Sequence, residues 1–530
     1  MDSPAPHEPR AASALALAAC FCAALAAPAA LTLVARPPSS EIEREFRRPA
    51  PFPATPVSAA TLAVWPRMFD AWYADHFGLR STLIRWNNAL ALFALGDSPT
   101  SEIVVGPEQW MFTTRDRAVE VRRGADPFSE RELALWADVL ADRRRWCEER
   151  GVRYVFAIAP NKESIYADYW PERLDVFAPT RREQLVEYVR GRADVPLLDL
   201  TPALAQARVD FAREGDVYFR LGTHWNDRGA LYAYRALLEH AAQGAPQFAP
   251  RPLSDFSFVA TDFQDDSWAG RLYLEDVLTQ PNVELKLEFE RGVPESFWRE
   301  AREKRLVSID STHARSDLPR AVVFHDSMGE KLRPLLAEHF SRASFRWVSD
   351  FDTDLIEREK PDIVIQLFVE RALSAFSLST SPFDTPERCQ AEFEASSQVL
   401  VRGLAGLEAD RSAPQRPVEL APGPDGSVTV RYGGGGVLAP QFEPPAGGWP
   451  VLRLEFDAPA DGQALIEFKT ERHREYARIA RGIQRPIRAG RNVVFVKLRV
   501  PQLAGRLRLH PGLAAGEYVL RDLEVRAVPE

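Results

Sequence analysis

The sequence predicts an α/β domain built on a mostly parallel sheet with helices on both faces, followed by an all-β, jelly-roll-like sandwich and preceded by a transmembrane helix. Helical and strand patterns alternate between residues 130 and 375, which is typical of a parallel sheet covered on both sides. From about residues 402–416 onward the chain is rich in Pro and Gly and shows strand patterns alone. A chain of 530 residues is too long for one core, so two or three domains are expected.

The N-terminal segment 11–35 contains no charged side chain and is long enough to cross a hydrocarbon core as a helix. We expect residues 1–35 to form an uncleaved signal anchor, while a cleaved signal peptide stays open as the alternative. Residues 36–65 are rich in Pro, which is typical of a spacer between an anchor and a folded domain. Arg10 and Arg36 flank the apolar segment on opposite sides, so the charges alone do not orient it.

Residues 66–400 are expected to form the α/β domain. Apolar residues at three- and four-residue spacing predict helices over Phe69–Leu95, Glu130–Arg150, Thr180–Gly191, Asp227–His240 and Lys331–Phe340. Short apolar runs predict buried strands over Tyr154–Ile158, Val195–Leu200, Ala321–Phe324, Ser344–Val348 and Ile363–Leu367.

Residues 416–530 are expected to form the sandwich, because several short segments such as Val451–Phe456 alternate apolar and polar side chains. From Arg416 onward the chain carries 17 Lys and Arg against 13 Asp and Glu, although its overall net charge is −9. A solvated surface and contact with an anionic polymer are both open interpretations of this basic end.

The overall composition excludes several classes of protein. With 45% hydrophobic and 27% charged residues the chain has the profile of an ordinary folded protein, and its negative net charge argues against nucleic acid as a general partner. No Cys/His cluster has metal-ligand spacing and no Gly-rich phosphate loop occurs, so we expect neither a metal nor a cofactor. Cys147 and Cys389 are expected to be two separate buried thiols.

Two short stretches predict the chemistry. The apolar run 321–324 ends in His325-Asp326-Ser327, which places a serine hydroxyl at the C-terminal end of a buried strand, where open α/β sheets build their sites. His224 lies in a polar loop and is of the residue type that usually takes the proton of a serine nucleophile. The carboxylate that would orient this histidine is expected close to His224, and the nearest upstream position of that kind is Gly222.

The order of motifs resembles that of the alginate O-acetyltransferase family, whose catalytic domain is SGNH-hydrolase-like. The matching segments lie between about residues 66 and 375 and read Asp75-His76-Phe77-Gly78-Leu79-Arg80, Gly106-Pro107-Glu108-Gln109-Trp110-Met111-Phe112, Pro160-Asn161-Lys162, Gly222-Thr223-His224-Trp225, His325-Asp326-Ser327-Met328 and Pro361-Asp362-Ile363-Val364-Ile365 with Glu370-Arg371. The last hundred residues resemble the jelly-roll modules that accompany carbohydrate-active enzymes. Each motif is weak alone, and the six in order are together a specific signal.

The resemblance implies a periplasmic O-acetyltransferase, anchored in the inner membrane, that moves an acetyl group through a serine acetyl-enzyme onto hydroxyls of an exopolysaccharide. A membrane-bound O-acyltransferase would supply the acetyl group. Ser327 would be the nucleophile and His224 the general base. The resemblance also makes Lys162, Trp225, Arg371 and Tyr166 candidates for the substrate pocket.

Gly222 leaves three explanations open. Another carboxylate, for which Asp216, Asp227 and Asp326 are the candidates, takes over the orienting role, or the enzyme works as a slower Ser-His dyad. Alternatively, the chain is a non-catalytic polysaccharide-binding or scaffold protein of an acetylation or secretion complex. We expect an enzyme, because a purely structural role would not require both Ser327 and His224. For a dyad, Gly222→Asp is expected to raise turnover, and if another carboxylate already serves, it is expected to do little or to harm.

Overall fold

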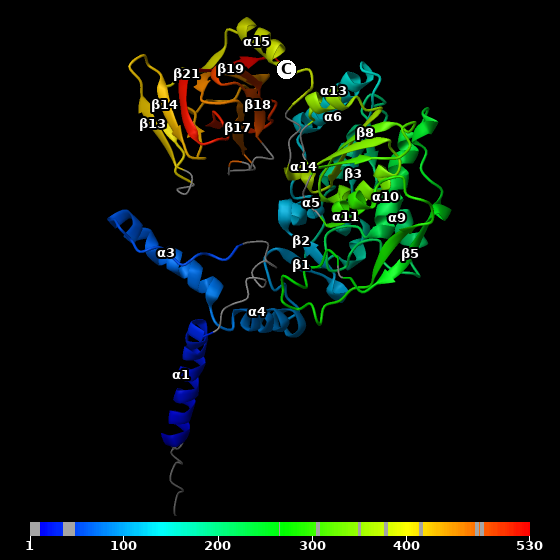
Figure 1. Cartoon of the computed structure of the whole chain (residues 1–530), viewed down its shortest axis with the longest axis vertical. Helices are drawn as coiled ribbons and strands as arrows, with labels where there is room; N and C mark the ends of the chain where they lie inside the picture. The colour runs from blue at the N-terminus through cyan, green and yellow to red at the C-terminus, as the bar shows by residue number, and fades with distance from the viewer. Residues whose placement is uncertain are drawn as a thin grey trace, which may run out of the picture.

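The structure is a computed structural model, and it describes residues 11–34, 48–263, 265–303, 308–347, 351–375, 380–412, 417–471, 476 and 482–529 (Figure 1). Residues 1–10 and 35 of the predicted anchor, residues 36–47 of the predicted spacer and residues 413–416 at the predicted start of the sandwich lie outside the described residues.

The described residues of the N-terminal part include three helical segments. The apolar helix α1 (Ala11–Val34) is, among the described residues, the one helix long and apolar enough to cross a membrane. The single helix predicted over 69–95 is wrong, because α3 (Ala59–His76) and α4 (Arg80–Ala89) are separated by a corner, and α4 continues into the π-helical turn η1 (Leu90–Ala94). Leu79 turns the chain at this corner with a φ of 65°, a left-handed conformation that interrupts a helix.

The predicted mostly parallel α/β sheet is confirmed. Six strands run in the order β4-β3-β10-β8-β9-β7, and every neighbouring pair is parallel except β7–β9 at one edge. Their bounds are β4 Leu197–Asp199, β3 Arg153–Ala159, β10 Ile363–Val369, β8 Arg320–His325, β9 Arg342–Arg346 and β7 Ile309–Thr312. All seven residues of β10 are buried, as a strand covered on both faces requires.

The crossover helices cover this sheet. They are α6 (Glu130–Glu148), α8 (Arg181–Tyr188), α9 (Thr201–Asp210), α10 (Asp227–Ala241), α12 (Leu332–Ala337) and α13 (Thr353–Glu359). Helix α6 begins at a capping box, in which Ser129 accepts from the Glu132 N–H and the Glu132 carboxylate accepts from the Ser129 N–H. Both α6 and α10 contact β3, whose residues from Tyr154 onward are all buried.

The C-terminal part is an all-β sandwich of two antiparallel sheets. One sheet has the order β13-β14-β21-β16-β19, with β11 also pairing with β21, and the other has the order β12-β15-β20-β17-β18. Their bounds are β11 Val399–Arg402, β12 Glu408–Ala409, β13 Val418–Pro422, β14 Val428–Tyr432, β15 Val437–Leu438, β16 Trp449–Ala458, β17 Gly462–Thr470, β18 Ile483–Ile487, β19 Gly490–Lys497, β20 Leu503–His510 and β21 Gly516–Val528.

The sandwich packs on the α/β domain through helix α15 (Pro386–Ala395) and an apolar seam. Trp449, Val451, Phe495 and Val528 of the sandwich join the same buried cluster as the α/β core. Arg131, in the first turn of α6, donates to the Gly448 carbonyl at 2.7 Å and lies 4.2 Å from the centre of the Trp449 ring. These residues fix the sandwich to the α/β core, while the sandwich keeps a separate buried cluster of its own.

Two hairpins flank the sheet and frame the site described below. They are β1 (Ile103–Val105) with β2 (Met111–Thr113), and β5 (Phe256–Thr261) with β6 (Asn282–Leu287). A small apolar cluster joins the first hairpin to η1, to the loop at Leu221 and to the segment 268–278, through residues that include Leu92, Met111, Trp268 and Leu272.

Candidate active site

Three adjacent parallel strands end in polar residues at the same edge of the sheet. Strand β8 runs into Asp326-Ser327, its neighbour β10 runs into Glu370-Arg371, and β3 runs through Pro160 into Asn161. Because parallel strands bring their carboxyl ends to one edge, these side chains gather where open α/β sheets build their sites.

Ser327 begins a tight turn that Asp326 holds in place. The turn is the 3₁₀-helix η7 (Ser327–Gly329), and the Asp326 carboxylate accepts from the Met328 N–H at 2.9 Å and from the Val369 N–H of β10 at 2.7 Å. Burial raises the pKa of Asp326, and the positive charge of Arg371 acts in the opposite direction. Asp326 thus positions the serine turn, and the prediction that it orients His224 is wrong.

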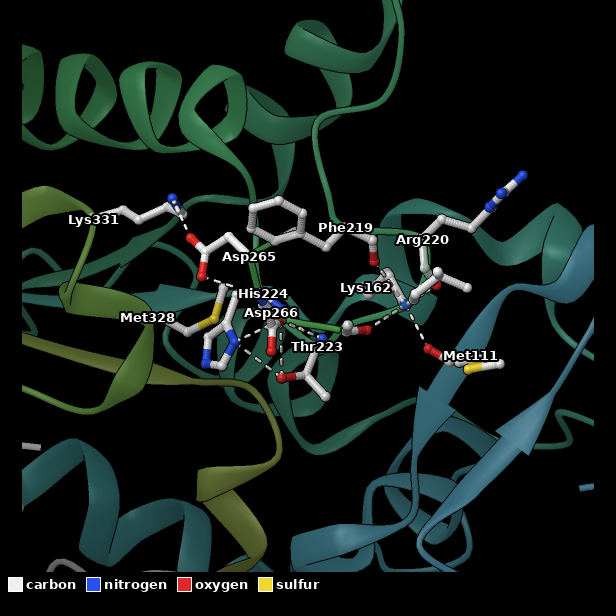
Figure 2. A network of polar contacts seen from close by, with 12 residues as sticks. Met111, Lys162, Phe219, Arg220, Thr223, His224, Asp265, Asp266, Met328 and Lys331 are labelled. Atoms are coloured by element: carbon white, nitrogen blue, oxygen red, sulfur yellow. Dashed lines mark hydrogen bonds and ion pairs between the residues drawn. The ribbon is translucent and has the colours of Figure 1, made fainter. Parts of the chain in front are cut away.

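His224 is oriented by Asp266, a residue that the sequence did not reveal (Figure 2). The Nδ1 atom of His224 lies 2.8 Å from Asp266 Oδ2, and the same oxygen accepts from the backbone N–H groups of Thr223 at 2.6 Å and His224 at 2.7 Å. The loop that carries Asp266 is held against this segment because the Trp268 N–H donates to the Leu221 carbonyl at 2.9 Å. The side chain of Gln280 adds a second tie by donating to the Asp265 carbonyl.

The contact fixes the protonation pattern of the imidazole. Burial alone would raise the pKa of Asp266, but the charge of His224 and the hydrogen bonds from His224 and Thr223 outweigh it and lower this pKa. A carboxylate accepts only, so Nδ1 carries the hydrogen and Nε2 is free to accept a proton. His224 Nε2 is buried, and no described residue gives it a hydrogen bond. In Figure 2 the imidazole lies beside Met328, the residue that follows Ser327.

Gly222 is accounted for by the same geometry. A Cβ atom at this position would lie 1.9 Å from the Asp266 carbonyl oxygen and 2.4 Å from its Oδ2. The carboxylate of Asp266 therefore occupies the space that a side chain at 222 would need. Asp266 itself has a φ of 33°, a conformation that Asp tolerates better than most residues and that is often found at functional sites.

The buried side chain of Lys162 holds backbone segments around the site together and does not line a pocket. Its buried ammonium group lies within hydrogen-bond distance of four carbonyl oxygens, which share its three N–H groups: those of Met111 at 2.5 Å, Phe219 at 3.0 Å, Arg220 at 2.9 Å and Gly222 at 2.5 Å (Figure 2). Burial lowers the pKa of Lys162 to about 7. The lysine thus ties hairpin β1–β2 to the loop before His224, which corrects the prediction that it contacts substrate.

Trp225 and Tyr166, two further candidates for the substrate pocket, are core residues. Trp225 is buried and packs edge-on against Tyr218, so it belongs to the core and does not wall the acyl pocket. Tyr166 stacks on Trp110 and accepts from the Val217 N–H at 2.8 Å, which also makes it a core residue.

The other two carboxylates proposed for His224 are engaged elsewhere. Asp227 pairs with Lys331 at 2.7 Å and accepts from the Leu285 N–H at 2.8 Å. Asp216 hydrogen bonds with Tyr166, and burial raises its pKa. Neither is the partner of His224, so both predictions are wrong.

Two buried nitrogen donors lie at the same sheet edge. Asn161 Nδ2 and Arg371 Nε make no hydrogen bond to a described residue, although Arg371 Nε lies 3.7 Å from Asp116 Oδ2, and Asn161 Oδ1 accepts from the Arg371 N–H at 3.4 Å. Glu370 pairs with Arg182 at 3.3 Å. Buried donors of this kind can stabilise negative charge that develops on a substrate oxygen.

No metal-binding cluster accompanies these groups. Within the described part of the chain, no three or more His, Cys, Asp or Glu side chains are placed to hold a metal ion.

Comparison with known proteins agrees with this geometry. Residues 103–272, which include both His224 and Asp266, match a family model described as the SGNH hydrolase-like domain of the acetyltransferase AlgX. Residues 103–272 of the α/β domain are thus similar to an SGNH hydrolase-like domain. The resemblance to alginate O-acetyltransferases inferred from the motifs is thereby confirmed for this part of the chain.

Individual relatives are distant. A probable alginate O-acetylase AlgJ of Pseudomonas syringae pv. tomato is 26% identical over 182 residues, which are 34% of this chain and 44% of that protein. The chain thus matches less than half the length of this relative. The O-acetyltransferase domain of Pseudomonas putida AlgJ has a TM-score of 0.35 at 20% identity, covering 55% of this chain and 99% of that one. AlgX of Pseudomonas aeruginosa has a TM-score of 0.36 at 13% identity, covering 84% and 98%.

Proposed function

We propose that the protein is an O-acetyltransferase in which Ser327 is the nucleophile, His224 the general base and Asp266 the orienting carboxylate. The observation that carries this proposal is the 2.8 Å contact between His224 and Asp266, beside the turn that presents Ser327. It also removes the single sequence feature that favoured a non-catalytic binding or scaffold protein, because Asp266 provides the carboxylate that Gly222 lacks.

The reaction proceeds in two acyl transfers. Ser327 Oγ attacks the acetyl carbonyl of the donor while His224 Nε2 takes its proton, and the imidazolium that forms faces the Asp266 carboxylate. Collapse of the tetrahedral intermediate breaks the bond to the donor oxygen, which leaves with the proton from Nε2 and produces acetyl-Ser327. A hydroxyl of the acceptor then attacks the acetyl group, Nε2 takes that proton, and Ser327 is released with its hydroxyl restored.

The oxyanion of each intermediate would be stabilised by buried donors of the sheet edge. Asn161 Nδ2 and Arg371 Nε are the candidates, since both are buried and neither makes a hydrogen bond to a described residue, although Arg371 Nε lies 3.7 Å from Asp116 Oδ2. Buried donors that are already in place stabilise developing charge more strongly than water does, because they need no reorganisation.

The acceptor in this proposal is an exopolysaccharide hydroxyl, and a membrane-bound O-acyltransferase delivers the acetyl group to the site. The α/β part from residue 66 would form the acetyltransferase domain. The carbohydrate-binding-like module would begin near residue 399 and not at the predicted 416, because β11 and β12 already pair with strands of its two sheets. The seam of Trp449, Val451 and Phe495 supports joint use of the two parts, because it fixes the sandwich against the α/β core.

The chain is proposed to stay in the inner membrane through residues 11–35, with its bulk in the periplasm. Retention of α1 is supported by its packing, because Thr32 Oγ1 accepts from the Gly78 N–H at 2.9 Å. Removal of α1 as a signal peptide would leave that N–H without this acceptor. Carbonate extraction of membranes tests the anchor, and release of the full-length chain would contradict it.

Hydrolysis of p-nitrophenyl acetate by the purified chain tests the nucleophile. Ser327→Ala is expected to reduce Ser-dependent turnover to the background rate, because no other atom replaces Oγ. Ser427→Ala, in the sandwich, is the matched control and is expected to retain turnover. If Ser327→Ala releases nitrophenol as fast as the unaltered protein, Ser327 is not the nucleophile.

A further inference from the structure

Helix α4 and its continuation η1 carry an exposed apolar stripe. Its members are 40–66% exposed and are Leu79, Leu83, Trp86, Leu90 and Phe93. Positions spaced by three and four residues lie on one face of a helix, so Leu83, Trp86 and Leu90 line up along it, with Leu79 at the corner before α4 and Phe93 in the π-helical turn that follows. A continuous exposed line of large apolar side chains, unlike isolated ones, marks a binding surface.

The opposite face of the same helix is fixed to the α/β domain. Asn88 is buried and its Nδ2 donates to the Leu272 carbonyl at 3.0 Å, and Leu92 belongs to the small apolar cluster with Leu272. Arg85 pairs with Asp276 and donates to the Tyr273 carbonyl at 2.9 Å. The helix is therefore already docked through its other side, and the stripe is not the face that packs into the domain.

The stripe begins at the end of the apolar helix α1. At the corner before α4, the Gly78 N–H donates to Thr32 Oγ1, and a Cβ atom on Gly78 would lie 2.4 Å from the Pro28 carbonyl oxygen. Only glycine allows this close approach. In Figure 1, α4 runs across the end of α1 and not along it. The last residue of the candidate membrane span is Thr32, so α4 begins where that span ends.

We propose that α4 and η1 lie in the plane of the membrane surface, with the stripe inserted into the boundary between headgroups and acyl chains. The occupant is the lipid bilayer, because the stripe is continuous with a helix whose apolar span ends at the same corner. Helices that lie in this interface place Trp, Phe and Leu toward the lipid, as this one does with Trp86, Phe93 and Leu90. The inference rests on the proposed retention of α1 in the membrane.

This arrangement would fix the height of the active site above the bilayer. Arg80 Nη1 donates to the Tyr273 hydroxyl at 3.0 Å, and the chain from Asp266 to Tyr273 is one short segment whose Trp268 and Leu272 are buried. The membrane helix, the interfacial helix and the carboxylate of the site are thus linked by packed contacts. A rigid link would hold Ser327 at a constant distance from an acetyl group that arrives at the membrane.

Site-specific fluorescence on the full chain in lipid vesicles tests the proposal. Cys20 and Cys22 lie in α1 and are replaced by Ala, while Cys147 and Cys389 are buried and stay. An environment-sensitive NBD label is attached at Leu83→Cys or Trp86→Cys. Val209→Cys on α9 is the control, because Val209 is a similarly exposed apolar residue on a different helix. The vesicles contain phospholipids only, with or without a doxyl quencher near the headgroup.

Labels at 83 and 86 are expected to emit at shorter wavelength than the label at 209 and to be quenched at least twofold by the shallow doxyl lipid. Water-like, unquenched emission at both positions, in chains that float with the vesicles, would overturn the proposal. Protection that appears only after a membrane-bound O-acyltransferase is added would also overturn it, since the stripe would then bind protein. If the labelled chains do not float with the vesicles, both the proposed anchor and this inference are wrong, whereas Ser327-dependent ester turnover would be unaffected.

Discussion

Replacing Asp266 by Asn isolates the charge of the orienting carboxylate. An amide oxygen in the place of Oδ2 can still accept from the Thr223 N–H, the His224 N–H and His224 Nδ1, so the three hydrogen bonds and the imidazole tautomer are retained. What the variant loses is the negative charge beside the imidazolium that forms when Ser327 gives up its proton.

The size of the effect follows from the contact distance. Two unit charges about 2.8 Å apart interact by about 6 kcal/mol at an effective dielectric constant of about 20. Because about a fifth of each side chain is exposed, solvent screening reduces this, and we take roughly half, about 3 kcal/mol. At about 1.4 kcal/mol per decade, kcat/KM should fall by a factor on the order of 10². Asp266→Ala also removes the hydrogen bonds and should fall further, by about 10³ to 10⁴.

The assay is p-nitrophenyl acetate hydrolysis over a range of substrate concentrations, with circular dichroism and thermal unfolding to establish that each variant is folded. Asp216 was also predicted to orient His224, so Asp216→Asn is the matched control. Its kcat/KM should stay within about twofold of that of the unaltered protein. A loss of less than about fivefold in Asp266→Ala would refute the assignment. So would a large loss in Asp216→Asn together with a small one in Asp266→Asn.

Three further outcomes are expected. Gly222→Ala and Gly222→Asp should both lower turnover, because either Cβ would meet the Asp266 backbone carbonyl, and a gain in Gly222→Asp would contradict this packing. Lys162→Met should lower the free energy of unfolding by about 3 kcal/mol in denaturant titrations, since it removes the buried amine from four carbonyls, of which those of Phe219 and Arg220 keep a backbone donor, whereas an unchanged midpoint would show that the other two find new donors. Burial raises the pKa of Glu163 from 4.5 to about 7 in the folded chain, so the fold binds this proton more tightly than the unfolded chain does. Stability should therefore fall as the pH rises from about 5 to 7, by at most about 1.4 kcal/mol per unit, and the slope should flatten in Glu163→Gln when unfolding is measured across this range.

The alternation of helix and strand patterns was sufficient to predict the α/β sheet, because each central strand is a short apolar run buried on both faces. Strand β10, predicted over 363–367 and observed over Ile363–Val369, is an example. The break between α3 and α4 was not predicted, since the apolar spacing continues across it and the decisive contact, between Gly78 and α1, lies more than forty residues away in sequence.

Ser327 and His224 could be proposed from local motifs, but their carboxylate could not. Asp266 lies 42 residues after His224 and reaches it only because the tertiary contacts of Trp268 and Gln280 fold its loop over Leu221. The one available signal was the acidic, Trp-containing stretch Asp262–Trp268, which has no fixed spacing to the histidine. Lys162 was noticed as a motif residue, yet its role depends on four backbone carbonyls, which side-chain patterns do not reveal.

The separate origin of Asp266 bears on how related chains are sorted into active and inactive groups. A survey that demands an acidic residue two positions before the histidine would discard this chain as a degenerate copy. A survey that asks whether any carboxylate fills the space above residue 222 would keep it. In such chains the small residue at 222 and the acidic residue on the distant loop are expected to be exchanged together. A change at one position alone would leave the histidine without a carboxylate or would create a steric clash between the two side chains. The activity of related chains should then be inferred from position 222 and the acidic position of the distant loop together.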